Sequence, residues 1–260
     1  FGGNRHGFLA FSEIHPDYYQ IPKEDREALL EAEAEAAEEE ARLREEEEDR
    51  GEMPGDEYDA DDESSEALAE DLAEAGVAAW NIEFKRWAPG EEGVWMDTLS
   101  DVLRAWGHLA LIPGIDIMRS MVMGHSAGGH LALLMGAKAE RRPWLAIAQA
   151  PITDLIGADH AKLSDEGDAV RRWIGCTPEE NEAVWRQLNP VEHPPNTSVL
   201  LFHGEHDVDV PLEQSETYAR VMKAKGADVQ KVWLPGDHYD IIDVASDDWL
   251  VQLNTVLDWL

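Results

Sequence analysis

Three short stretches, far apart along the chain, hold residues that can carry out nucleophilic chemistry. The pattern GHSAG contains Ser126, the stretch HGEHDVDVP contains Asp207, and the stretch GDHYD contains His238. A serine hydroxyl is a poor nucleophile unless a base accepts its proton, and that base must itself be oriented. The order Ser, Asp, His therefore predicts acyl transfer, with Ser126 as nucleophile, His238 as general base and Asp207 as the acid that orients the base.

The elements expected around these stretches should bring them to one edge of a sheet. An apolar strand at 118–124 precedes Ser126 and a helix at 127–139 follows it. A sharp strand-to-helix turn presents the hydroxyl at the helix N-terminus, where free amides favour negative charge, so the Ala127 amide is a predicted oxyanion donor. Strands at 198–204 and 228–236 run into the other two stretches. Functional residues of open α/β sheets collect beyond the carboxyl ends of strands, so we expect all three to converge.

Strand and helix patterns alternate over most of the chain. Strands are expected at 77–84, 118–124, 144–151, 198–204 and 228–236, and helices at 64–76, 94–110, 127–139, 212–226 and 246–260. Helices of 10 to 15 residues between strands indicate βαβ crossovers. The sequence predicts a single α/β domain over 1–260, with a mainly parallel sheet and helices on both faces.

Three motifs, GHSAGGHLAL, LFHGEHDVDVP and LPGDHYDIID, resemble the nucleophile elbow, acid loop and histidine loop of the α/β-hydrolase superfamily. More narrowly, they are similar to its esterase and kynurenine formamidase-like branch. The resemblance implies a triad of Ser126, Asp207 and His238, and hydrolysis of a small carboxylic ester or an arylformamide such as N-formylkynurenine, without a metal or other cofactor. It also implies that the less regular stretch 152–195 is a cap-like segment over the substrate.

The opening of the chain should supply the second oxyanion donor that the resemblance implies. In the branch this loop reads His-Gly-Gly, whereas here the chain reads FGGNR. Gly2 and Gly3 match the loop, and the amide of Gly3 or Asn4 is the predicted donor. Phe1 stands where the branch usually has His, and Arg5 stands where formamidases tend to have Trp, which is a departure from the formamidase pattern.

The resembled fold has strands before this loop, one of them between the strands expected at 77–84 and 118–124. We find no segment that fits this place. A gap in the sheet interior would leave buried backbone groups unpaired, each costing about 1 to 3 kcal/mol. We therefore expect strands to be missing at the N-terminus and the natural protein to extend upstream of Phe1.

Acidic residues are concentrated in one segment. Of the formal net charge of −34, residues 24–63 contribute −17. A solvated helix over 24–50 and a flexible stretch over 51–65 predict an acidic insertion at 24–65, because few apolar residues are available to pack. Such charge repels nucleic acid and anionic membranes. The alternative function is a weak or inactive hydrolase-fold scaffold that binds a basic protein partner through this insertion.

Cysteine usage and apolar runs limit the setting of the protein. Cys176 is the only cysteine, so an intramolecular disulfide cannot form and a disulfide-stapled secreted scaffold is excluded. The sequence has neither an apolar run of about 18 residues nor a signal-peptide pattern at its start. We expect a reducing, cytoplasmic compartment.

Several residues admit two interpretations. Asp209 and Asp240 are rival acids for His238. The run HGEHD could bind a metal, but its position at a strand end, without a zinc-helix motif, favours ordinary loop contacts. His125 and His130 are interpreted as packing or hydrogen-bonding partners of the elbow. Four tryptophans fit a substrate pocket or the core equally well: Trp87, Trp95, Trp173 and Trp185.

Overall fold

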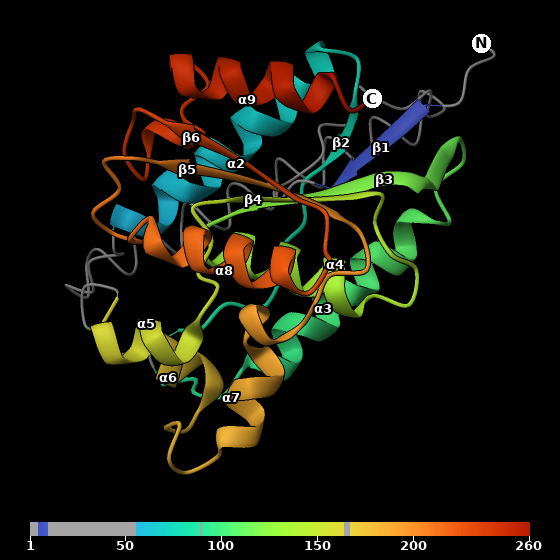
Figure 1. Cartoon of the computed structure of the whole chain (residues 1–260). Coiled ribbons are helices and arrows are strands. Elements are labelled where there is room, and N and C mark those ends of the chain that lie inside the picture. Colours follow the sequence, from blue (N-terminus) through green and yellow to red (C-terminus); the bar gives the residue numbers. More distant parts are fainter. Residues whose placement is uncertain (1–4, 10–55, 89, 164–166) are drawn as a thin grey trace, which may run out of the picture.

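The structure is a computed structural model that describes residues 5–9, 56–88, 90–163 and 167–260. These residues form a six-stranded parallel sheet in the order β2-β1-β3-β4-β5-β6, with helices on both faces (Figure 1). The strands are β1 (Arg5–Leu9), β2 (Ala78–Trp80), β3 (Ile115–His125), β4 (Leu145–Gln149), β5 (Ser198–Gly204) and β6 (Val229–Leu234). The helices are α2 (Asp56–Glu74), α3 (Trp95–Leu109), α4 (Ala127–Lys138), α5 (Leu155–Ala161), α6 (Ala169–Ile174), α7 (Glu182–Leu188), α8 (Glu213–Ala224) and α9 (Asp247–Leu257), with short 3-10 turns η2 (Pro190–Glu192) and η3 (Asp240–Ile242). Within the described ranges no helix combines the length and apolar character needed to span a membrane.

Two apolar cores lie on opposite faces of the sheet, because side chains alternate along each strand. In β3, Met121 and Met123 face the core that α2 and α9 cover, whereas Val122 faces the core of α3, α4 and α8. Figure 1 shows α9 above the strands and α4 with α8 below them. The expected mainly parallel sheet with helices on both faces is therefore confirmed.

Strand β1 occupies the place in the sheet that we expected to be empty. Leu9 pairs with Trp80 of β2 on one side and with Val122 of β3 on the other, both in parallel. The expectation that no segment fills this gap is wrong. The sequence RHGFL has neither an apolar run nor clean alternation, so pairing on both sides, rather than local strand propensity, defines this strand. A register shift between His6 and Phe8 interrupts the pairing with β3.

Helix α2 begins earlier than the sequence suggests. The expected flexible stretch 51–65 is wrong for its last ten residues, which belong to α2. Leu68 and Leu72 of this helix are buried in the core shared with α9, and this packing supports a helix whose early residues have few apolar anchors of their own. Residues 24–55 lie outside the described part of the chain, so the acidic insertion stays a prediction there.

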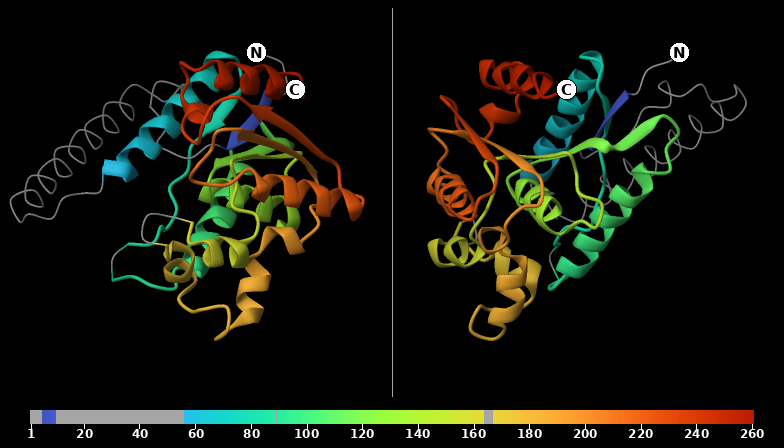
Figure 2. Two further views of the ribbon diagram at one scale, coloured as in Figure 1. Left: turned by 60° about the vertical axis from the view of Figure 1, so that its left-hand side comes forward. Right: turned by 45° about the vertical axis from the view of Figure 1, so that its right-hand side comes forward.

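The stretch 152–195 is more helical than expected, since it contains α5, α6, α7 and η2. These helices form one group at the end of the molecule away from α9 (Figure 2). Helices α5, α6 and α7 share a core with Leu134 of α4, and Trp185 is fully buried in it. Trp173 donates a hydrogen bond from its indole to the Thr98 hydroxyl (3.0 Å). For these two tryptophans the packing interpretation holds, whereas a role of the stretch as a cap over substrate stays a prediction.

Candidate active site

Ser126 lies at the sharp turn between β3 and α4, as the sequence predicts. Its backbone has φ 52° and ψ −112°, a strained positive-φ conformation that costs a residue other than glycine about 1 to 3 kcal/mol. The surrounding backbone holds it there: the Ser126 amide donates to the carbonyl of Gln149 (2.8 Å), and its carbonyl accepts from the amide of His130 (3.1 Å). The turn therefore joins the ends of β3 and β4 to the first turn of α4.

Gly124 is the residue that makes this turn possible. A Cβ atom at this position would lie 2.3 Å from the carbonyl oxygen of Gly128, which is far inside van der Waals contact. A Cβ at Gly128 would meet nothing within 4 Å. Of the two glycines in the GHSAG pattern, only Gly124 is thus required by the close approach of strand and helix.

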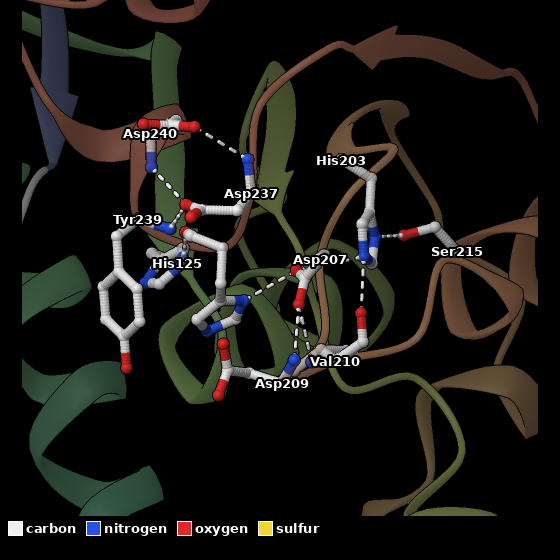
Figure 3. Close-up of polar contacts among 10 residues, drawn as sticks. His125, His203, Asp207, Asp209, Val210, Ser215, Asp237, Tyr239 and Asp240 are labelled. Atoms are coloured by element: carbon white, nitrogen blue, oxygen red, sulfur yellow. Dashed lines mark hydrogen bonds and ion pairs between the residues drawn. The ribbon is translucent and has the colours of Figure 1, made fainter.

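Asp207 follows β5 and directs its carboxylate into the protein. Its Oδ1 accepts hydrogen bonds from the amides of Asp209 (2.9 Å) and Val210 (2.7 Å), and its Oδ2 accepts from Nδ1 of His238 (2.7 Å) (Figure 3). The side chain is fully buried, and Nε2 of His203 lies 3.3 Å from Oδ2. Burial raises the pKa of this carboxyl, but the hydrogen bonds from His203 and His238 outweigh that effect and hold the pKa well below its usual range. Asp207 is therefore anionic near neutral pH.

His238 lies beside the elbow through contacts with His125. Nε2 of His125 is 3.0 Å from the carbonyl oxygen of His238, and the two ring centroids are 4.3 Å apart. Because a carbonyl can only accept, this nitrogen of His125 carries the hydrogen. Burial, and next the proximity of His238, lower the pKa of His125 to about 3, so its ring is neutral. Since His125 directly precedes Ser126, the predicted base His238 and the predicted nucleophile Ser126 lie at the same end of the sheet.

The acid loop and the histidine loop meet through a close backbone contact. The amides of Glu205 and His206 donate to the carbonyls of Leu234 (2.7 Å) and Gly236 (3.1 Å). A Cβ at Gly204 would lie 2.4 Å from the carbonyl oxygen of Gly236, so a side chain there would separate the loops. This contact sets the short distance between Asp207 and His238.

Buried side chains from distant parts of the sequence hold the histidine loop. The carbonyl of Ile241 accepts from the amide groups of Gln149 (3.2 Å) and Gln252 (2.6 Å), both of which are buried. The amide of Gly236 donates to the carboxylate of Asp248 (2.8 Å). Sequence reasoning missed these supporting residues, because no periodic pattern relates Gln149, Asp248 and Gln252 to the loop that they hold.

Among the three candidate acids, Asp207 is the one that hydrogen-bonds His238. The carboxylate of Asp240 instead accepts from the amide of Asp237 (3.0 Å), within the histidine loop itself. The carboxylate of Asp209 is exposed. Ligand atoms of Asp207, Asp209 and His238 lie within 4.8 Å of one another, a spacing that could hold a metal ion. A cation bound there would compete with the hydrogen bond between Asp207 and His238.

The two histidines of the run HGEHD bind different partners, as the interpretation of this run as ordinary loop contacts predicts. Nδ1 of His203 lies 2.8 Å from the Ser215 hydroxyl and Nε2 lies 2.8 Å from the Val210 carbonyl. Nδ1 of His206 bonds the Pro235 carbonyl instead. Both histidines thus make ordinary loop contacts.

A cavity of about 180 Å³ opens beside Ser126. The exposed Ala127 occupies the first position of α4, where a backbone amide has no acceptor within its own helix. This amide is available to an oxyanion at Ser126, whereas Gly2, Gly3 and Asn4, the other predicted oxyanion residues, lie outside the described residues. The cavity is lined by the elbow and by Ser65, Leu68, Ile82, Glu83, Phe84, Arg86, Met123, Gln149 and Ile242.

Comparison with known proteins gives one family match and several structural neighbours. Residues 82–260 match the prolyl oligopeptidase family. The acylamino-acid-releasing enzyme of Arabidopsis thaliana is 25% identical over 175 residues, which cover 64% of this chain but only 22% of the plant protein. This chain therefore spans about a fifth of the length of that relative.

Two solved structures illustrate the likeness in fold. The acylaminoacyl peptidase of Pyrococcus horikoshii has a TM-score of 0.55 and 23% identity, over 64% of this chain and 28% of that protein. The acetyl ester-xyloside bifunctional hydrolase of Caldicellulosiruptor lactoaceticus has a TM-score of 0.60 and 21% identity, over 74% of this chain and 75% of that protein. At these identities the likeness shows the fold, which is that of the α/β-hydrolases.

Proposed function

This chain belongs to the prolyl oligopeptidase family of serine hydrolases, and on that premise we propose that it cleaves a small carboxylic ester or amide through an acyl-enzyme on Ser126. One observation carries the proposal. The carboxylate of the buried, anionic Asp207 lies 2.7 Å from Nδ1 of His238. The loop that carries His238 packs against His125, the residue that precedes the strained Ser126.

Each of these residues has a step in the proposed reaction. Nε2 of His238 takes the hydroxyl proton as the Ser126 oxygen attacks the carbonyl carbon, and Asp207 stabilises the imidazolium that forms. The Ala127 amide donates to the negative oxygen of the tetrahedral intermediate. The intermediate expels the alcohol or amine, which leaves with the proton from His238. Water then attacks the acyl-enzyme with His238 again as base, which releases the acid and restores Ser126.

The size of the cavity supports a small acyl group. At about 180 Å³ it is well below the roughly 300 to 1,000 Å³ of pockets that hold drug-sized ligands. A short-chain ester or an arylformamide fits this limit. The name of the Caldicellulosiruptor neighbour includes an acetyl ester, which agrees with a short acyl chain. The departures at Phe1 and Arg5 make the ester the first choice over the formamide of the kynurenine formamidase-like branch.

A second candidate is cleavage of an N-acyl amino acid from an amide leaving group. The observation that favours it is the match to the plant acylamino-acid-releasing enzyme. The mechanism on Ser126 would be the same, and the difference would lie in the acyl group that the cavity accepts. The scaffold alternative through the acidic segment 24–65 predicts weak turnover or none.

Labelling with a fluorophosphonate probe tests the nucleophile. We expect the wild-type protein to be labelled, Ser126→Ala to lose the label, and Ser198→Ala to keep it. Ser198 is the matched control because it lies at the opposite end of the sheet, where its hydroxyl bonds Asp228. A folded wild-type protein that takes up no label, or a Ser126→Ala protein that is still labelled, would overturn the assignment.

A substrate series tests the acyl group. We expect kcat/KM to fall from 4-nitrophenyl acetate to the butyrate and to the octanoate, with N-formylkynurenine and N-acetylalanine 4-nitroanilide measured alongside. A preference for the octanoate would contradict the small acyl site. Cleavage of the N-acetylalanine anilide in place of the esters would favour the second candidate.

A further inference from the structure

Asp207 contacts a second histidine that the proposed mechanism does not use. His203 is the penultimate residue of β5 and is fully buried. Its Nε2 lies 3.3 Å from Oδ2 of Asp207, the same oxygen that accepts from His238. Figure 3 shows His203 between Asp207 and Ser215. A buried imidazole in this position can act on the triad only through the carboxylate.

The hydrogen bonds of His203 define its tautomer. Nε2 lies 2.8 Å from the carbonyl oxygen of Val210, and because a carbonyl only accepts, the hydrogen is on Nε2. This hydrogen lies between the Val210 carbonyl and the Asp207 carboxylate. Nδ1 is 2.8 Å from the hydroxyl of Ser215, a fully buried residue of α8, so Nδ1 accepts and the hydroxyl donates. The Val210 carbonyl therefore fixes the tautomer, Ser215 stabilises it by donating to Nδ1, and the nitrogen that carries the hydrogen lies 3.3 Å from Oδ2 of Asp207.

We propose that His203 is a positioning residue for the triad and that Ser215 acts through it. The resulting chain of contacts runs from Ser215 to His203, to Asp207 and to His238, the proposed base for Ser126. This inference rests on the proposed function, because it concerns the same site. It adds two residues, one at a strand end and one on a helix, that do not touch the substrate.

The consequence is a carboxylate fixed on both oxygens. Oδ1 of Asp207 accepts two backbone amides, and Oδ2 lies between two imidazole N–H groups. Without His203 the buried Oδ2 would have one donor fewer, and the carboxylate could turn away from Nδ1 of His238. The imidazolium formed during the reaction would then be less stabilised, because its partner is less well aligned.

Other titratable groups also face the carboxylate and must stay constant in the test. Asp209 lies on the same loop, Asp237 and His238 lie on the histidine loop, and His125 lies on the elbow. Helix α8 contributes Ser215, and strand β6 contributes the Trp233 ring, edge-on to His203 with centroids 6.4 Å apart. Substitutions confined to residues 203 and 215 leave Asp209, Asp237, His238 and His125 in place.

The kinetic test compares His203→Leu, His203→Gln and Ser215→Ala with the control Thr217→Ala. The control removes another hydroxyl of α8, one that bonds Arg220. We expect His203→Leu to lose about 10-fold in kcat, far less than the roughly 10,000-fold loss typical of removing the orienting carboxylate. KM should stay within about two-fold, and the acidic limb of the pH profile of kcat/KM should move to lower pH. His203→Gln, whose amide can donate in place of Nε2, should recover part of the loss.

For Ser215→Ala we expect a roughly three-fold loss, the value of one neutral hydrogen bond, and no loss for the control. Folding is checked by thermal melting. If His203→Leu does not fold, His203→Gln and Ser215→Ala still carry the test. Folded variants with wild-type kcat and an unmoved pH profile would overturn the proposal.

Imidazole nitrogen NMR tests the same contacts without turnover. In protein labelled with ¹⁵N-histidine, the His203 resonances should show a hydrogen on Nε2 and a bare, hydrogen-bonded Nδ1. Ser215→Ala should shift the Nδ1 resonance, and Thr217→Ala should not. A hydrogen on Nδ1 would overturn the inference. Failure of the proposed function would instead be seen as missing fluorophosphonate labelling, so the two failures are distinguishable.

Discussion

Ser126, the proposed nucleophile, and its two proposed partners, Asp207 and His238, are held by different kinds of structure. The elbow at Ser126 is fixed mainly by backbone contacts within a few residues, from Gly124 to His130. The loop that carries His238 is held by side chains of two other elements, Gln149 of β4 and Gln252 of α9, and by backbone contacts with the loop that carries Asp207. The difference indicates that a short motif is enough to specify the nucleophile, whereas the base and acid depend on the assembled sheet.

The largest effect should come from the acid at the centre of the two loops. For Asp207→Asn we expect kcat/KM to fall roughly 10,000-fold, because the amide favours the wrong tautomer of His238. Asp209→Asn is the matched control, since it removes an exposed carboxylate two residues away, and it should change kcat/KM less than about three-fold. Ester hydrolysis under steady-state conditions measures both. Equal losses in the two variants would show that the loop, rather than one carboxylate, orients the base.

A substitution that disturbs the elbow backbone should act by lowering the stability of the fold rather than by removing a catalytic group. Gly124→Ala places a methyl group against the backbone of Gly128, so we expect the free energy of unfolding to fall by more than about 3 kcal/mol. Gly128→Ala meets open space and should change it by less than about 1 kcal/mol. Urea denaturation measures both variants. If Gly124→Ala lowered the free energy of unfolding only slightly, strand and helix could separate and the elbow would not be rigid.

The same difference explains what the sequence could predict. The elbow was predictable because its glycine, serine and flanking strand and helix are neighbours in the sequence. The buried strands β4 and β5 were predictable from short apolar runs, and both are present. The pairing of Asp207 with His238 was predictable as an order of motifs, and the geometry agrees with it.

What the sequence could not predict are features decided by tertiary contacts. Strand β1 exists because β2 and β3 pair with it on both sides, and RHGFL alone carries no such signal. The early residues of α2 continue a helix that Leu68 and Leu72 attach to the core. The supports of the histidine loop, Gln149 and Gln252, are 103 residues apart, so no periodic pattern relates them.

Low pH should lower the free energy of unfolding because of His130, a histidine in the helix that follows the elbow. This residue of α4 is buried, its Nε2 lies 2.8 Å from the Leu188 carbonyl, and burial lowers its pKa to about 4. Above pH 6.5 the ring is neutral in both states. Between pH 6.5 and 4 only the unfolded state takes up the proton, so stability should fall by about 3 kcal/mol over this window.

The variant His130→Gln should remove this part of the pH dependence, because its amide can still donate to Leu188 but does not titrate. His108→Gln, at an exposed histidine of α3, is the control and should leave the dependence unchanged. Urea denaturation from pH 7 to pH 4 measures the difference. The contribution of Asp207 does not interfere, because a carboxylate with a lowered pKa loses its stabilising effect only below about pH 4. An unchanged slope in His130→Gln would mean that this histidine takes up its proton in the folded state.

The smallest effect, and the sharpest test of the comparison, should come from Gln252. Its amide donates to the Ile241 carbonyl and its carbonyl accepts from Gln149, so Gln252→Met keeps most of the volume but removes both bonds. We expect a loss of about 1 to 2 kcal/mol, because Ile241 keeps Gln149 as a donor, together with a two- to three-fold lower kcat/KM as the histidine loop loosens. Asn254→Ala, on the exposed side of α9, should change neither quantity measurably. If Gln252→Met matched Asn254→Ala in both, distant side chains would not hold the loop. Its contacts with the acid loop and His125 would then have to position the base by themselves.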